Sequence, residues 1–197
     1  MRAAQYCGPS RVETIEPRLA NGAPPASAES VLDRLSELGV RHRTVQHAPL
    51  RTVADSKAHR HDPHGGYSKN LFLRNKKGRM WLVTLHEDRQ VDLKALGAHI
   101  GAGRVSFASA QRLMHYLGVV PGAVTPLAVI NDHGNQVSAI MDTGLLRFAT
   151  VHFHPCDNSL TTTLNSQGLL RFMRACGHDP QLIDFDDFAA APAAAGR

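Results

Sequence analysis

Residues 65–78, with the sequence GGYSKNLFLRNKKG, constrain the fold of this chain more than any other segment. The apolar run that follows the polar residues predicts a strand at 71–74, which pairs with a second strand at 79–86 across a turn at 75–78. Lys69 lies just before this apolar run. Burying the stem of a lysine costs desolvation unless an anion meets the ammonium group. The segment therefore predicts a hairpin with an anion-binding lysine at its entrance.

Four further cations, Arg74, Lys76, Lys77 and Arg79, follow with no acidic residue between them. Such a run suits a phosphate-bearing partner. Lys76 and Lys77, however, lie in the turn, where lysines are usually only solvated, and that interpretation is favoured for them. For Lys69 the anion-binding interpretation is favoured, because it lies outside the turn.

The overall composition is that of an ordinary globular protein, with 197 residues, 43% hydrophobic and 20% charged residues. This length predicts one domain with a substantial core. The net charge of +5 points weakly to a polyanionic partner. Three cysteines without a CxxC pair predict a reducing compartment rather than a disulfide scaffold. No signal peptide or membrane-spanning segment is expected, so a cytoplasmic protein without a membrane partner is predicted.

Hydrophobic periodicity and capping residues divide the chain into a flexible extension at 1–26, a domain at 27–186 and a disordered tail at 187–197. Helices are expected at 27–38, 52–58, 92–100, 109–118 and 165–177, and strands at 40–47, 71–74, 79–86, 104–107, 127–131, 137–141, 148–154, 159–164 and 181–185. A hairpin turn is expected at 132–135. Hairpins mixed with short helices, without a repeated βαβ unit, predict a mixed α+β fold.

The loop at 122–126 is a candidate for positioning a substrate. Gly122 allows a sharp turn, and Pro126 leads the chain into the next predicted strand. The N–H groups of Ala123, Val124 and Thr125 have no obvious ladder partners, so they could donate to a carbonyl oxygen or a developing oxyanion. An ordinary Pro/Gly connection is the equally weighted alternative.

His152, His154 and Cys156 alternate, so on a strand their side chains would share one face, as in half of a zinc site. Pro155 would interrupt that strand and no fourth ligand is evident, so a single histidine that lines a pocket is favoured. Asn158 would add an orienting amide. No GxSxG elbow, Walker loop or HExxH helix is present, and no metal or cofactor is expected.

Five segments together resemble the YbaK/prolyl-tRNA editing superfamily, and within it the freestanding ProX-type proteins that deacylate alanyl-tRNA(Pro) in trans. These segments are SKNLFLRNKKG at 68–78, VDLK at 91–94, SFAS at 106–109, GAVTP at 122–126 and HPxxN at 154–158. The resemblance covers about residues 27–186. Tyr67-Ser68 and Cys156-Asp157 depart from the family pattern near the pocket.

The resemblance implies one compact domain with a curved, mostly antiparallel or barrel-like sheet surrounded by helices. It also implies hydrolysis of the ester that joins a wrong amino acid to the terminal adenosine of a tRNA, without a cofactor. By position, the implied catalytic residues are Lys69, Gly122 and His154, and the implied substrate-binding residues are Asn70, Ala123, Val124, Thr125, Pro126 and Asn158.

The function expected on this basis is trans-editing of tRNA(Pro) charged with alanine, with prolyl-tRNA synthetase as a transient partner. Three alternatives stay open from the sequence. They are a sibling deacylase for cysteinyl- or seryl-tRNA, a tRNA-binding module without catalysis, and a metal-dependent hydrolase that uses His152, His154 and Cys156.

Overall fold

The computed structural model describes residues 16–48 and 62–186. The helices are α1 (Ala28–Glu37), α3 (Leu93–His99), α4 (Ala110–Leu117), the 3₁₀ helix η1 (Pro126–Asn131), α5 (Thr143–Leu146) and α6 (Ser166–Ala175). The strands are β1 (His42–Gln46), β2 (Gly66–Asn75), β3 (Met80–His86), β4 (Val105–Phe107), β5 (Val137–Asp142), β6 (Val151–Phe153), β7 (Leu160–Leu164) and β8 (Gln181–Ile183).

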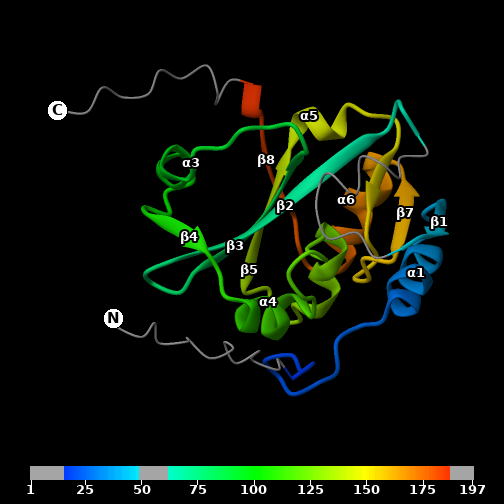
Figure 1. Cartoon of the computed structure of the whole chain (residues 1–197), viewed down its shortest axis with the longest axis horizontal. Coiled ribbons are helices and arrows are strands. Elements are labelled where there is room, and N and C mark those ends of the chain that lie inside the picture. The colour runs from blue at the N-terminus through cyan, green and yellow to red at the C-terminus, as the bar shows by residue number, and fades with distance from the viewer. Residues whose placement is uncertain (1–15, 49–61, 187–197) are drawn as a thin grey trace, which may run out of the picture.

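One eight-stranded mixed sheet, in the order β1-β7-β6-β2-β3-β5-β8 with β4 beside β2, forms the centre of the molecule (Figure 1). Four strand pairs are antiparallel and three are parallel. The predicted single α+β domain is confirmed, and its mixed sheet has more antiparallel than parallel pairs. The predicted return hairpin at 132–135 is wrong, because β5 pairs in parallel with both β3 and β8.

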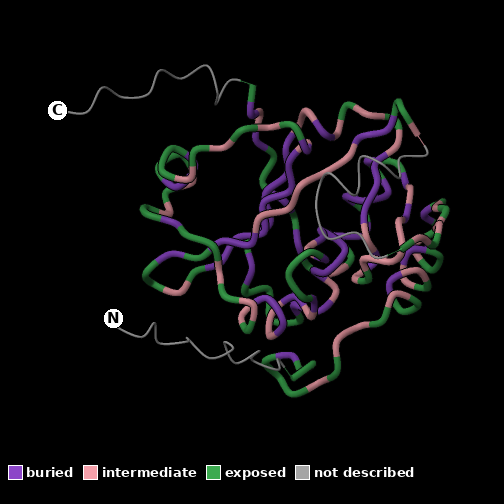
Figure 2. Tube along the Cα trace, in the orientation of Figure 1, coloured by how far each residue is buried: buried purple, intermediate pink, exposed green. Residues whose placement is uncertain are grey.

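Strand β2 joins the two halves of the sheet. It pairs with β3 from Ser68 to Arg74 but with β6 only at Gly66 and Tyr67. Successive side chains of a strand point to opposite faces. Phe72 accordingly lies in a core cluster with the helices α1, α4 and α6, whereas Leu73 lies in a second cluster with α3, β4 and β8. Figure 2 shows the buried trace concentrated along the central strands.

The helices begin where capping side chains were expected. Ser27, Asp92, Ser109 and Asn165 each accept a hydrogen bond from a first-turn N–H of the following helix. α4 ends at Gly118, whose φ of 65° is the left-handed conformation that glycine adopts without a steric penalty. Local capping chemistry therefore accounts for the confirmed helices α1, α3, α4 and α6.

Three segments differ from expectation or lie beyond description. Residues 127–131, predicted as a strand, form η1, because Thr125 caps the turn and Pro126 at its first position favours helical φ. β2 begins at Gly66, five residues before the predicted strand, so Lys69 lies within the strand rather than before it. The helix predicted at 52–58 lies outside the described residues.

The described part of the expected N-terminal extension contacts the domain. Leu19 is buried, the N–H of Ala20 donates to the carbonyl of His115 at 2.8 Å, and the N–H of Ala26 donates to Asn131 Oδ1 at 2.8 Å. Among the described helices, none combines the length and apolarity that crossing a bilayer requires.

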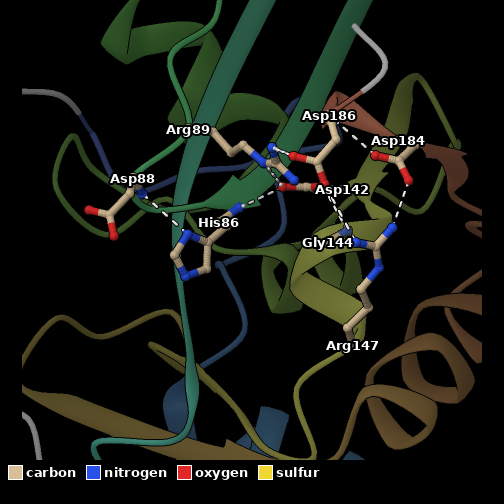
Figure 3. Close-up of polar contacts among 8 residues, drawn as sticks. All are labelled: His86, Asp88, Arg89, Asp142, Gly144, Arg147, Asp184 and Asp186. Atoms are coloured by element: carbon tan, nitrogen blue, oxygen red, sulfur yellow. Dashed lines mark hydrogen bonds and ion pairs between the residues drawn. The ribbon is translucent and has the colours of Figure 1, made fainter. Parts of the chain in front are cut away.

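A network of charges, here called the Asp142 corner, ties the C-terminal segment to β3 and β5 (Figure 3). Asp142 is fully buried and accepts hydrogen bonds from the N–H groups of His86 and Gly144 and from Arg89 Nε. Arg89 also bonds Asp186. Arg147 completes the network, with one bond to Asp186 and one of 2.8 Å to Asp184. Each oxygen of Asp142 therefore has a partner, as a buried carboxylate requires.

Candidate active site

The candidate site is a wedge between β2 and β6, which separate after their two paired positions. The rings of Tyr67 and His152 close the narrow end, stacked at a centroid distance of 4.4 Å and an interplanar angle of 10°. Alternation along β2 places Lys69 on the same face of the sheet as Tyr67, whereas His154 follows directly after the end of β6 at Phe153. A cavity of about 50 Å³ fills the wedge. Its lining residues are Tyr67, Ser68, Asn70, His152, Phe153, His154 and Thr161.

Asn70 connects the wedge to the loop at 122–126. Its Nδ2 donates to the carbonyl of Val124 at 2.9 Å and more weakly to Ser68 Oγ at 3.3 Å. Its Oδ1 is buried and accepts no hydrogen bond from any described residue. A buried amide oxygen without a donor is costly, so this atom is available to a ligand that brings a donor.

The first half of the loop presents backbone to this region. Gly122 is exposed and has a φ of 91°, which other residues rarely adopt. The N–H of Ala123 is already used on the carbonyl of Val120, and its side chain is buried in the core. Across the described chain, no group accepts the N–H of Val124. The N–H of Val124 can therefore donate to a ligand, while the carbonyl of Val124 accepts a hydrogen bond from Asn70 Nδ2.

The second half of the loop is structural in its side chains. Thr125 is fully buried, and its Oγ1 accepts the N–H of Leu127 at 3.3 Å. Pro126 is also buried and begins η1. These residues fix the exit of the loop, so only their backbone could contact a substrate.

The tautomer of His154 follows from its hydrogen bond. Its Nδ1 lies 2.7 Å from the carbonyl oxygen of Leu160, which can only accept, so Nδ1 carries the proton and Nε2 offers a lone pair. Burial lowers the pKa of His154, and the nearby His47 ring, 6.0 Å away between centroids, lowers it further, whereas the Leu160 bond opposes the shift. The imidazole is therefore neutral at pH 7 and acts as an acceptor.

Lys69 lies in the middle of β2, opposite Leu85 on β3. It is half-buried, and burial lowers the pKa of its ammonium group, while the charge of Asp88 partly offsets this shift. The ammonium group is thus less solvated than a surface lysine and gains more from an anionic ligand. Lys69 borders the wedge, one residue from both Ser68 and Asn70, but is not among the residues that line the cavity.

A layer of polar side chains behind the cavity was not predicted from the sequence. His152 Nδ1 accepts from or donates to Thr163 Oγ1 at 3.0 Å, and His152 Nε2 lies 3.4 Å from Asp62 Oδ2. Asp62 also accepts the hydroxyl of Thr150 at 2.7 Å. A side chain at Gly65 would overlap the His152 ring, so the glycine lets this layer close up. The signal in the sequence was Gly65 itself, the first of the two glycines that precede Tyr67.

Cys156 has the properties of an inert thiol. Burial raises its pKa to about 12, so the thiolate that a nucleophile or a metal ligand requires is absent at neutral pH. Its φ of 63° turns the chain out of the β6 direction, which separates it from His152 and His154. Over residues 16–48 and 62–186, no group of three His, Cys, Asp or Glu side chains has an arrangement that could hold a metal ion. Asn158 lies in the turn that follows, and its role stays a prediction.

Comparison with known proteins decides the family. The model of the aminoacyl-tRNA editing domain matches residues 47–172. The chain belongs to this family. The editing domain is 37% identical over 158 residues to prolyl-tRNA synthetase associated domain-containing protein 1 of Mus musculus, covering 78% of this chain and 93% of that protein. It is 35% identical over 157 residues to the prolyl-tRNA editing protein ProX of Acetoanaerobium sticklandii, covering 79% and 96%.

Solved structures agree on the fold of the editing domain. A candidate trans-editing enzyme for prolyl tRNA synthetase superposes with a TM-score of 0.64 at 21% identity, over 82% of this chain and 98% of that chain. The protein APE2540 superposes with a TM-score of 0.63 at 20% identity, over 78% and 97%. The predicted family and activity class are confirmed: the domain is an aminoacyl-tRNA deacylase, a hydrolase whose substrate is a charged tRNA.

Proposed function

We propose that this editing domain acts in trans on tRNA(Pro) mischarged with alanine, and that prolyl-tRNA synthetase is its transient partner. The observation that carries the proposal is the size of the wedge. A cavity of about 50 Å³ admits only a few water-sized groups, since ~10–15 Å³ of such space is enough for one water. The methyl group of alanine fits such a space, and the three-methylene ring of proline exceeds it.

The direction of this size filter matches the error that it corrects. A synthetase site built for proline cannot exclude the smaller alanine, because each missing methylene changes binding by only ~1–3 kcal/mol. A second site that is too small for proline reverses the order of preference. Overfilling a packed site by a few methylenes costs ~1–3 kcal/mol or more, so correctly charged tRNA survives.

Each side chain of the wedge has a role in this proposal. Lys69 binds a phosphate of the terminal nucleotide, for which its lowered pKa and partial burial suit it. His154 Nε2 accepts a hydrogen bond from the amino group of the esterified amino acid. Asn70 Oδ1 accepts from a ribose hydroxyl, which satisfies an otherwise unpaired buried atom.

The reaction needs no covalent enzyme intermediate. A water adds to the ester carbonyl carbon, the resulting oxyanion is stabilised by the N–H of Val124, and the bond to the 3′ oxygen breaks. That oxygen leaves with a proton as the tRNA hydroxyl, and the free amino acid is released. Neighbouring 2′-hydroxyl groups of the tRNA assist the water, since the ester is already activated and chiefly requires positioning.

The test is a deacylation panel with alanyl-, cysteinyl-, seryl- and prolyl-tRNA(Pro) under single-turnover conditions. Alanyl-tRNA(Pro) is expected to be hydrolysed at least tenfold faster than the others, with prolyl-tRNA(Pro) stable. Faster hydrolysis of the cysteinyl or seryl ester would replace the proposal by the sibling activity, and rapid loss of proline would contradict the size filter.

A further inference from the structure

A groove of about 650 Å³ lies at the end of the β1–β7 pair that is remote from the wedge. The wall on one side is the turn between α1 and β1, and the wall on the other side is one face of α6, from its cap Asn165 to Arg174. Its lining residues are Gly39, Val40, Arg41, Asn165, Gln167, Gly168, Arg171 and Arg174. In Figure 1 the elements α1, β1, β7 and α6 lie together, on the side of the molecule away from α3.

The groove is strongly cationic. No acidic residue is among those that line it, although three arginines are. Arg174 is neutralised by Asp179, but Arg171 donates only to the uncharged carbonyl of Leu38. Arg41 is exposed and makes no hydrogen bond or ion pair within the described residues. Two uncompensated guanidinium groups therefore face one opening.

The first turn of α6 adds backbone N–H donors, which carry partial positive charge and so attract anions as the arginines do. Asn165 caps the helix by accepting the N–H of Gly168 at 2.6 Å. Helix geometry leaves the N–H groups of Ser166 and Gln167 without a carbonyl one turn earlier, and the helix dipole places partial positive charge there. A side chain at Gly168 would overlap Val40, so glycine lets this turn approach the α1–β1 connection. Guanidinium groups and helix amides together suit an anion with several oxygens.

We propose that this groove binds the phosphodiester backbone of the tRNA whose charged end enters the wedge. The inference rests on the proposed function for its choice of partner. Thr161 lines the wedge and Asn165 lines the groove, four residues further along the same segment, which is ~13 Å at ~3.3 Å per residue. Arg43, exposed on the edge strand β1 opposite Thr163, lies between them. Arg43 thus adds one positive charge between the groove and the wedge, along the route that the phosphates of one RNA strand would follow.

Two variants test the groove. Arg41→Glu breaks no contact with the described chain, and Arg41→Ala combined with Arg171→Ala removes both uncompensated charges. Each should raise the Kd for uncharged tRNA(Pro) at least tenfold and lower the salt slope of log Kd by ~0.7–0.9 per lost phosphate contact. The KM for alanyl-tRNA(Pro) should rise with kcat unchanged. Hydrolysis of an alanylated CCA trinucleotide, which is too short to reach the groove, should be unaffected.

Lys76→Ala combined with Lys77→Ala is the matched control, because it removes two exposed charges from the β2–β3 turn. Its Kd should stay within twofold of the wild-type value, and thermal melting should show all variants folded. The proposal would be overturned if the groove variants kept the wild-type Kd and salt slope. It would also be overturned if the control variant lost as much tRNA affinity as the groove variants. If wild-type protein fails to deacylate alanyl-tRNA(Pro), the proposed function fails, and the binding of uncharged tRNA still decides the groove.

Discussion

The wedge and the Asp142 corner both bury polar groups, but they treat them in opposite ways. In the corner, both oxygens of Asp142 have partners, and Arg89 reaches a second carboxylate at Asp186 (Figure 3). In the wedge, Asn70 Oδ1 is buried without a hydrogen-bond partner among the described residues, and His152 Nε2 has only the 3.4 Å ion-pair contact with Asp62. Satisfied polar groups stabilise a fold, whereas unsatisfied ones cost stability and gain it back when a ligand binds. We therefore interpret the corner as structural and propose the wedge as a binding site.

The largest expected effect concerns the corner. Asp142→Ala should lower the free energy of unfolding by ~3 kcal/mol, because it removes the cap of α5 and leaves the half-buried Arg89 with one partner fewer. Urea denaturation measures this loss. Asp142→Asn, which keeps one acceptor oxygen, should lose less, ~1–2 kcal/mol. Deacylation per folded molecule should remain near wild type in both, and a selective loss of activity would erase the contrast between the regions.

For Lys69 we expect a loss of activity without a loss of stability. Lys69→Ala should reduce deacylation of alanyl-tRNA(Pro) by about 100-fold, equivalent to ~2.7 kcal/mol, because a phosphate of the substrate loses its counter-charge. The unfolding midpoint should not fall, since the variant also removes the desolvation that lowers the pKa of the lysine. Lys77→Ala at the exposed turn serves as the charge control. Wild-type turnover in Lys69→Ala would refute the assignment of the wedge as the active site.

Substitution of Asn70 tests stability and activity together, because the Nδ2 of Asn70 is hydrogen-bonded to the protein and its Oδ1 is not. Asn70→Ala should slow deacylation by about tenfold and change the free energy of unfolding by no more than ~1 kcal/mol, since the lost Val124 bond is offset by removal of the unpaired oxygen. Single-turnover kinetics and denaturation of the same preparation give both values. A loss of several kcal/mol in stability would place Asn70 with the corner instead.

The smallest expected effect is a pH dependence of the wedge. Burial lowers the pKa of His154 below its ordinary value of 6.5, so the acceptor form prevails at neutral pH and above. Activity should be flat there and fall only as the pH drops through the lowered pKa. Stability should fall over the same acidic range, because the unfolded chain takes up the proton more readily. His154→Gln should abolish this acidic decline in kcat, and a decline retained in that variant would exclude His154 as its origin.

The sequence predicted the parts of the fold that depend on local chemistry. Capping residues such as Ser109 and Asn165 located helices. The parallel pairing of β5 with β3 and β8 was missed, because register between distant strands leaves no local mark. The segment 127–131 was misassigned, since its apolar run suits a strand as well as a buried 3₁₀ turn.

The shape of the candidate site was not predictable from the sequence. The wedge exists because β2 leaves β6 after Tyr67, a consequence of topology that no spacing in the chain records. The stacking of Tyr67 on His152 and the contact of His152 with Asp62 likewise depend on strands that meet only in the folded protein. Asp142 lies directly before the short helix α5, which is a typical place for a capping residue. Its pairing with Arg89 could not be predicted from that position.

Strand β2 is attached to β6 by two residue pairs and to β3 by seven. The three-stranded unit β1-β7-β6 thus meets the rest of the sheet through a narrow seam at the edge of the wedge. A substitution at Gly66, which does not line the cavity but whose side chain would meet Phe148, is therefore expected to alter amino-acid selection by shifting this seam.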